Sequence, residues 1–277
     1  MAKNAAVYRP YITYLTLLLI MFILALLFRR EAEPVSEEFI LGGFIEPEII
    51  ESNIPDFASM LDVQEKKDTF FSYLQPYVDA VNQRIMSQRQ QLLNLRNKTQ
   101  QGVTLNRNEM AFLSELRVDY ELEEERLNTR NLINRLLKRA DIIPSSLALA
   151  QAANESAWGT SRFATQGKNF FGQWCYSQGC GIIPNQRPSG ASYEVRSFDS
   201  VLDSVESYIM NLNTFPSYQH LRDIRLELRE EGQPIDGITL SEGLDSYSQR
   251  GDEYIEELQS MIHSNNLLEL DTINREG

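Results

Sequence analysis

The stretch "PSSLALAQAANESAWGTSRFATQGKNFFGQWC", Pro144 to Cys175, decides how the rest of this chain is interpreted. Glu155 is the only acidic residue in it, and the next one along the chain is Glu194. The whole chain has 39 acidic residues among 277, so a long run with a single carboxylate is unusual for this sequence and indicates a special role for that residue. Pro144 at the start and Gly159 past the end predict a helix that carries Glu155 near its C-terminus.

Glu155 is expected on the inward side of this helix. The residues on or near that face are Leu147, Gln151, Asn154, Glu155 and Trp158. A carboxyl group on a largely apolar face loses hydration, which raises its pKa. A Glu that stays protonated near neutral pH can donate a proton to a leaving oxygen, as in glycoside cleavage, and acid-free surroundings suit a neutral glycan. The alternative is a structural Glu that caps the helix or pairs with Arg162 or Lys168.

Composition and motifs exclude several other classes of protein. A formal net charge of −13 argues against binding of duplex nucleic acid, which requires a basic face. Cys175 and Cys180 have no histidine nearby, so we expect no zinc site, and nothing supports a Cys/His nucleophile built with His220 or His263. The sequence has no P-loop, dinucleotide-binding glycine fingerprint or G-x-S-x-G elbow. We expect no cofactor.

An uncharged segment near the N-terminus predicts a membrane anchor. Tyr11 to Phe28 is 18 residues without a charge, and a helix of that length measures about 27 Å, close to the thickness of the hydrocarbon core. No cleavage site of small residues follows it, which favours an uncleaved anchor over residues 1–30 rather than a signal peptide. Basic residues flank both ends almost equally, so the positive-inside rule gives only a weak orientation.

The remaining chain reads as a linker and one mainly helical body. Residues 31–62 contain three prolines and many acids, which is typical of a linker. The body, residues 63–277, begins with helices over 63–140, and "SYEVRSF" alternates like a strand in a short β-hairpin. Two helical stripes predict buried faces, one of Phe70, Leu74, Tyr77, Val78 and Val81, the other of Val201, Val205, Tyr208, Ile209 and Leu212.

Three motifs in order resemble the glucosaminidase family of peptidoglycan hydrolases (glycoside hydrolase family 73). The family has an "ES-x-W-G-x-S" helix end with the catalytic Glu, then an "N-L-F-G" turn. This chain has Glu155, Ser156, Trp158, Gly159 and Ser161 in the first, and Asn169, Phe170, Phe171 and Gly172, with Phe for Leu, in the second. "YSQRGDEYIEELQSMI" resembles the closing segment and places Tyr247 at its tyrosine. The resemblance extends from Val63 to Ile262 and is closest to the membrane-anchored Bax-like branch.

The resemblance implies a lysozyme-like α+β fold, with Glu155 in a cleft between a helical lobe and a small β lobe. It implies hydrolysis of the β-1,4 bond from N-acetylglucosamine to N-acetylmuramic acid in peptidoglycan glycan strands. Because that substrate is in the wall, it also implies a periplasmic body on a single-pass anchor in the inner membrane. Protein partners are not indicated.

A second catalytic group is also required. Glu194 is the acidic residue of the expected β lobe, although Arg196 would also pair with it, and a substrate acetamido group is the alternative. Asp199 and Asp203 instead suit the first turn of the next helix. Tyr247 would hold the attacking water or the acetamido oxygen, unless it is an ordinary buried tyrosine.

Other residues of the segment are candidates for contact with sugar. Trp158, Phe171 and Trp174 offer aromatic faces, Asn169 and Gln173 offer hydrogen bonds, and Trp158 is as well suited to support Glu155 from the core. The "CYSQGC" loop would border the cleft, with Cys175 and Cys180 either joined in a disulfide or left as two thiols.

Two rival functions remain open from the sequence. A lytic transglycosylase also uses one Glu in an "ES" context, but it usually continues into a "G-L-M-Q" element, where this chain has "NFFGQW". A non-catalytic, membrane-tethered peptidoglycan-binding or scaffold protein is the other. Analysis of the reaction products separates all three.

Overall fold

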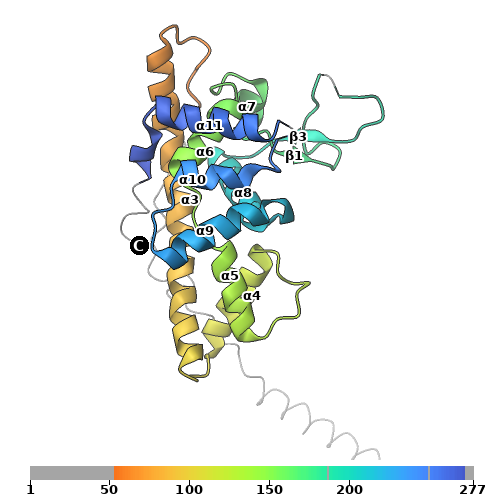
Figure 1. Ribbon diagram of the computed structural model, residues 1–277. Coiled ribbons are helices and arrows are strands. Elements are labelled where there is room, and N and C mark those ends of the chain that lie inside the picture. Colours follow the sequence, from red (N-terminus) through yellow and green to blue (C-terminus); the bar gives the residue numbers. More distant parts are fainter. Residues whose placement is uncertain (1–52, 186, 249, 272–277) are drawn as a thin grey trace, which may run out of the picture. The chain divides into compact units, whose positions relative to one another are not determined.

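The computed structural model describes residues 53–271 apart from positions 186 and 249 (Figure 1). The longer helices and the strands of this part follow one another in the order α3 (Val63–Gln100), α4 (Arg107–Asp119), α5 (Thr129–Arg139), α6 (Ser145–Glu155), α7 (Arg162–Gly167), β1 (Trp174–Cys175), β2 (Gly181–Ile182), β3 (Glu194–Arg196), α8 (Val201–Thr214), α9 (Gln219–Glu231), α10 (Gly237–Ser241) and α11 (Asp252–Ser264). Three short 3-10 turns complete it, η1 (Pro216–Tyr218), η2 (Glu242–Leu244) and η3 (Leu267–Leu270).

Helix α3 is the longest element and runs along the helical body in Figure 1. Its 38 residues correspond to a length of about 57 Å. Asp62 caps it by accepting a hydrogen bond from the Glu65 N–H at 2.8 Å. The helix packs against α5, α6 and α8, and the whole predicted stripe from Phe70 to Val81 is buried, which confirms that prediction.

The core consists of two clusters of buried apolar residues. The larger one joins the first half of α3 to α6, α8 and α11, and it includes the predicted stripe of α8. The smaller one joins the second half of α3 to α4 and α5, through side chains such as Leu92, Leu113 and Leu136. Helix α3 therefore connects both clusters and fixes α4 and α5 to the body that carries Glu155.

A buried carboxylate secures the segment that leads into α6. Asp141 accepts from Arg229 at 2.9 Å and lies 3.1 Å from Arg89, and Arg225 donates to the Asp141 and Ile142 carbonyl groups. Burial alone would raise the pKa of Asp141, but Arg225 and Arg89 together hold it below its usual range. The path of the chain just before α6 is thus set by charge-assisted hydrogen bonds.

The N-terminus of α6 is capped by residues distant in sequence. Pro144 precedes the helix and offers no side-chain cap. Asp271 instead accepts from the Ser146 N–H at 2.9 Å and the Ser146 hydroxyl at 2.6 Å, and Asp79 accepts from the Ser145 hydroxyl at 2.9 Å. Since unsatisfied N–H groups at a buried helix start are costly, these acceptors fix the helix whose other end is Glu155.

The small sheet has three antiparallel strands in the order β1-β3-β2, rather than the single hairpin predicted. Trp174 pairs with Val195 and Cys175 with Glu194, while Ile182 on the other side also pairs with Val195. The strands are two or three residues long, too short for a pairing pattern to be visible in the sequence. In Figure 1 the sheet lies to one side of the helices.

The mainly helical class with a small sheet is confirmed, and the likeness to lysozyme stays a prediction. The predicted anchor, residues 1–30, and most of the predicted linker lie outside the described residues. Within the described part, no helix has both the length and the apolar character needed to cross a bilayer. Residues 53–62 of the predicted linker contribute Phe57 to the core, where its ring lies 5.4 Å from that of Phe70.

Candidate active site

Glu155 lies in a cleft of about 720 Å³. The walls come from the end of α6, the turn before β1, the sheet, α8, and the segments around Tyr218 and Tyr247. The charged, aromatic and amide side chains that line it include Asp119, Glu121, Glu155, Phe171, Gln173, Trp174, Arg196, Tyr218 and Tyr247. A cleft bounded by helices on one side and the small sheet on the other is the arrangement that the resemblance implies.

The first motif forms the turn that ends α6 and places Glu155. Ala157, Trp158 and Gly159 all have positive φ, at 51°, 57° and 74°. The Ser156 hydroxyl accepts from the Gly159 N–H at 2.8 Å, and a Cβ at Gly159 would collide with the Phe57 ring. Two non-glycine residues in the left-handed region cost energy, and such strain is found at functional sites. The turn stops the helix directly after Glu155.

The second motif approaches Glu155 from the opposite side. Gly172 has a φ of 63°, and a Cβ there would lie 3.3 Å from Glu155 Oε2. Asn169 fixes this turn, because its side-chain oxygen accepts from the Phe171 and Gln173 N–H groups at 3.2 and 3.1 Å. A side chain at Gly172 would crowd the carboxylate and strain the backbone. The two motifs therefore build one site.

Tyr254 is the direct hydrogen-bond partner of Glu155. Its hydroxyl donates to Glu155 Oε1 at 2.9 Å and accepts from Gln151 Nε2 at 3.0 Å, and the Tyr208 hydroxyl donates to Gln151 Oε1 at 2.6 Å. A connected chain of buried polar groups thus runs from α8 through α6 to the cleft. Tyr254 lies within the third motif, but nothing in the sequence pattern marks it as the partner of Glu155.

Burial raises the pKa of Glu155 above its usual range. The Tyr254 hydrogen bond and the positive charge of Arg250 oppose this shift, and the negative charge of Glu257 adds to it. Desolvation penalises the charged carboxylate more than a single neutral donor compensates. The carboxyl group is consequently suited to hold a proton and release it to a group in the cleft.

Tyr247 also lines the cleft. Its ring stacks on Tyr254, with centroids 5.4 Å apart and planes at 8°, and its hydroxyl donates to the Phe171 carbonyl at 3.3 Å. Burial and the neighbouring Tyr254 raise the pKa of Tyr247 well above its usual value, so its hydroxyl stays neutral and able to donate.

Three more of the predicted contact residues line the cleft. Trp174 is 50% exposed and its ring lies 4.2 Å from that of Tyr193, so it presents a free aromatic face. Phe171 stacks on Tyr208 with centroids 3.9 Å apart and is almost fully buried. Gln173 donates to the Ser204 carbonyl and accepts from the Ser207 hydroxyl, so both ends of its amide group already bond to α8.

Trp158 and Asn169 are not among the residues that line the described cleft. The Trp158 ring packs on Phe70 and Phe71 at 5.7 and 5.4 Å, below the turn that carries Glu155. Asn169 is 1% exposed and its side chain donates to the Gln173 and Arg196 carbonyls at 2.9 and 2.8 Å. In this conformation both residues support the site rather than face the substrate.

Glu194, in β3, is not among the residues that line the described cleft. It is 3% exposed, and its carboxylate accepts from the Gly179 and Gly181 N–H groups at 3.1 and 2.9 Å. These two bonds lower its pKa. Arg196, the expected ionic partner, has no ion pair with Glu194 in the described part and lies against the Phe198 ring instead. A catalytic role for Glu194 stays a prediction.

A disulfide joins Cys175 and Cys180 beside Glu194. Among the described residues, these three form the one His, Cys, Asp or Glu group close enough to hold a metal ion. Because both sulfur atoms are in the disulfide, no thiolate is available as a ligand. The group is better explained as a fastening of the loop between β1 and β2.

Two acidic residues of the cleft were missed. Asp119 and Glu121 line it together with Glu155 and follow one another closely at the end of α4. All three motifs lie at or after Glu155, so they point to a second carboxylate only in that part of the chain. No local pattern marks a residue of α4 as facing a cleft built mainly by α6 and α8.

Comparisons with known proteins agree with this geometry. Residues 130–267 match the family model Glucosaminidase, described as mannosyl-glycoprotein endo-beta-N-acetylglucosaminidase. Over 218 residues the chain is 33% identical to Protein bax of Escherichia coli (strain K12), covering 78% of this chain and 76% of that protein. The chain belongs to the glucosaminidase family. No solved structure is significantly similar to it.

Membership in the glucosaminidase family confirms the resemblance stated on the three motifs. It also accounts for the chemistry of the cleft in general terms, since a glycosidase needs a carboxyl group that is protonated when substrate binds. The matched residues include both motifs around Glu155 and the Tyr247–Tyr254 segment. They exclude α4 and the turn after it, which contribute Asp119 and Glu121 to the cleft.

Proposed function

We propose that this protein is a peptidoglycan hydrolase that cleaves the β-1,4 bond from N-acetylglucosamine to N-acetylmuramic acid, with Glu155 as the general acid. The observation that supports this most is the Glu155 carboxyl group at the end of α6, buried enough to raise its pKa yet open to a cleft of about 720 Å³. In the proposed reaction, the Glu155 proton passes to the glycosidic oxygen as the bond to the anomeric carbon breaks.

The second step needs a group that helps water add to the oxocarbenium-like centre. The acetamido oxygen of the bound sugar is one such group, and in the proposed reaction the hydroxyl of Tyr247, which lines the cleft, would hold it. A carboxylate is the other, and Glu194 or the cleft residues Asp119 and Glu121 are the candidates. Trp174 would carry a sugar ring on its exposed face.

The proposed place of action is outside the cytoplasm, because that is where the wall lies. The disulfide between Cys175 and Cys180 supports an oxidising compartment. The uncharged segment from Tyr11 to Phe28 would keep the body at the inner membrane, facing the periplasm. Labelling of an introduced exposed cysteine by a membrane-impermeant reagent in intact spheroplasts tests this part.

Mass spectrometry of purified peptidoglycan, digested with the full-length protein and with Glu155→Gln, tests the reaction. Fragments that end in reducing N-acetylglucosamine, and that disappear with the variant, are expected. Anhydro-muramic ends would instead identify a lytic transglycosylase. Intact wall with both proteins, together with retained binding to it, would identify the non-catalytic binding or scaffold role.

A further inference from the structure

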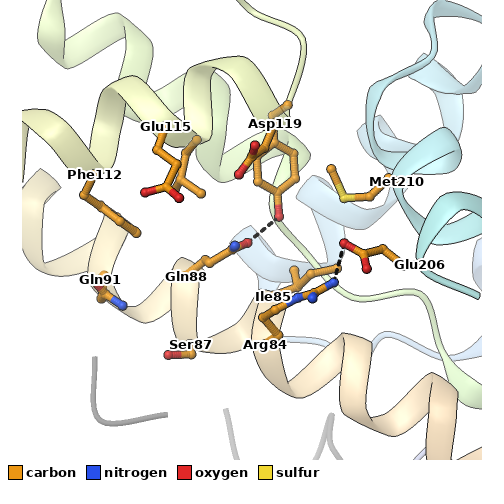
Figure 2. A pocket seen from close by; sticks show the side chains of 12 residues that line it. Arg84, Ile85, Ser87, Gln88, Gln91, Phe112, Glu115, Asp119, Glu206 and Met210 are labelled. Carbon is orange, nitrogen blue, oxygen red and sulfur yellow. Dashed lines mark hydrogen bonds and ion pairs between the residues drawn. The ribbon is translucent and has the colours of Figure 1, made fainter. Parts of the chain in front are cut away.

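A second pocket of about 410 Å³ adjoins the cleft, between α3, α4 and α8 (Figure 2). Asp119 and Met210 line both cavities. The two are therefore neighbours that share part of a wall, so a molecule bound in the cleft has the pocket beside it. Neither the three motifs nor the matched family region accounts for this pocket, since nine of its 12 lining residues belong to α3 and α4, which precede the matched residues 130–267.

The floor of the pocket is apolar. Ile85, Phe112 and Leu116 line it and are each 2% exposed, and Met210 forms the side toward the cleft. Figure 2 shows Ile85 and Met210 on facing helices, with Phe112 farther along. A surface of this kind binds the methylene stem of a long side chain while the polar end stays near the rim.

The rim is rich in carboxylates. Glu115, Asp119 and Glu206 line the pocket together with one arginine, Arg84, which forms an ion pair with Glu206 at 2.5 Å. Within the described part of the chain, Glu115 and Asp119 have no ion pair. Asp119 is also the last residue of α4, where the helix dipole adds negative potential. The pocket thus has a deficit of positive charge beside an apolar floor.

The titration of Asp119 agrees with this charge pattern. Burial and the negative charge of Glu115 raise the pKa of Asp119, with Arg84 only partly opposing them. A cation bound between the two carboxylates would relieve their repulsion and lower that pKa. An anionic ligand would be repelled by the two carboxylates and is disfavoured.

We propose that this pocket binds the amine-bearing side chain of a peptide attached to the glycan, with its methylene groups on the apolar floor and its ammonium group between Glu115 and Asp119. This inference rests on the proposed function. In peptidoglycan a short peptide hangs from the muramic acid, and a basic diamino acid within it presents a primary amine. Because Asp119 and Met210 belong to both cavities, such a peptide leaves the cleft next to the pocket.

Calorimetric titration of full-length Glu155→Gln protein with a disaccharide-peptide fragment tests the proposal without turnover. The fragment is used in three forms: with its amine free, dimethylated or acetylated. Dimethylation keeps the positive charge, whereas acetylation removes it. The free and dimethylated forms are expected to bind roughly fivefold more tightly than the acetylated form, the upper range for an exposed ion pair, and added salt should reduce the difference.

Adding Glu115→Gln to this protein should abolish most of the preference, because Glu115 lines the pocket and not the cleft. Glu124→Gln is the matched control, since Glu124 is an exposed acid a few residues on that lines neither cavity. Equal affinity for all three forms, or no binding of any, would overturn the proposal. So would binding of free lysine as tight as that of the fragment, because the occupant would then be a free amino acid.

Cleavage by the wild-type protein is measured separately, so the two proposals fail in different ways. An amine preference without any glycan cleavage refutes the proposed hydrolase and keeps the pocket. Cleavage of peptide-bearing and peptide-free glycan at equal efficiency, unchanged in Glu115→Gln, keeps the hydrolase and refutes the pocket.

Discussion

Glu155 ends helix α6 in the cleft, whereas Glu194 lies in the central strand of the small sheet. Glu155 receives one hydrogen bond, from the neutral hydroxyl of Tyr254, and burial raises its pKa. Glu194 receives two hydrogen bonds from backbone N–H groups, and these lower its pKa. The same side chain thus holds a proton more readily in one place and is favoured as an anion in the other. Burial and the number of donors around a carboxylate decide this difference.

The largest effect is expected from Glu155→Gln, which removes the proton donor and keeps the shape. Glycan cleavage should fall by about 10²- to 10⁴-fold, the contribution typical of a general acid. A fall of less than about tenfold, measured by release of reducing ends from peptidoglycan, would place the general acid elsewhere.

Glu155→Gln should also change how the stability of the folded protein depends on pH. The raised pKa means that the folded state binds a proton more readily than the unfolded state, so this group lowers stability as pH rises from 4.5 through the folded-state pKa. Glu155→Gln should therefore be more stable than wild type at neutral pH, with the gain vanishing below pH 4.5. Thermal unfolding at several pH values checks this.

Tyr254→Phe should sharpen the comparison by taking away the hydroxyl group that donates a hydrogen bond to Glu155 and favours its ionised form. The pKa of Glu155 then rises further, and the decline of activity at high pH moves to higher pH. Activity at the wild-type optimum should fall by about tenfold or less. The measurement is a pH profile of kcat/KM.

Tyr247→Phe is the matched control, because Tyr247 stacks on Tyr254 but does not donate to Glu155. It should lower kcat and leave the high-pH decline where it is. An unmoved profile in Tyr254→Phe would show that its hydroxyl does not influence the catalytic proton.

The sequence predicted one side of this comparison better than the other. The motifs place Glu155 because a helix end and its turn are local, and the stripe of α3 is visible because burial repeats along one helix. Tyr254 was not found, since its bond to Glu155 spans 99 residues. Glu194 was found as an acid in a strand, but the amide groups that it binds belong to a loop with no repeating pattern. Contacts made only by the tertiary fold leave no local signal.

Glu194→Gln tests whether Glu194 is mainly an anchor of the loop. An amide cannot accept on both sides as a carboxylate does, so the loop between β1 and β2 should loosen and the melting temperature should fall. Activity should stay within about tenfold of wild type. A loss beyond about 10²-fold with an unchanged melting temperature would instead assign Glu194 to catalysis.

The smallest effect on activity is expected from Cys175→Ser with Cys180→Ser. The disulfide closes a loop with a sequence separation of 5, for which loop-closure entropy corresponds to about 2 kcal/mol of stability. Activity should change by no more than about threefold, because neither sulfur atom lines the cleft. Thermal unfolding with and without a reducing agent measures the loss of stability, and peptidoglycan cleavage measures the change in activity.

Combining these changes shows whether the disulfide and Glu194 act together. Both fasten the same loop, and Cys175 lies opposite Glu194 in the sheet. Their effects on stability should therefore be less than additive, as is typical of residues that share one structural unit. If the two losses of stability add up fully, the Gly179 and Gly181 N–H groups still donate to Glu194 when the disulfide is absent. The pH profile of activity that Glu155 sets should not shift in the Glu194 and disulfide variants, since they change neither the Tyr254 hydroxyl that donates to Glu155 nor the burial of Glu155.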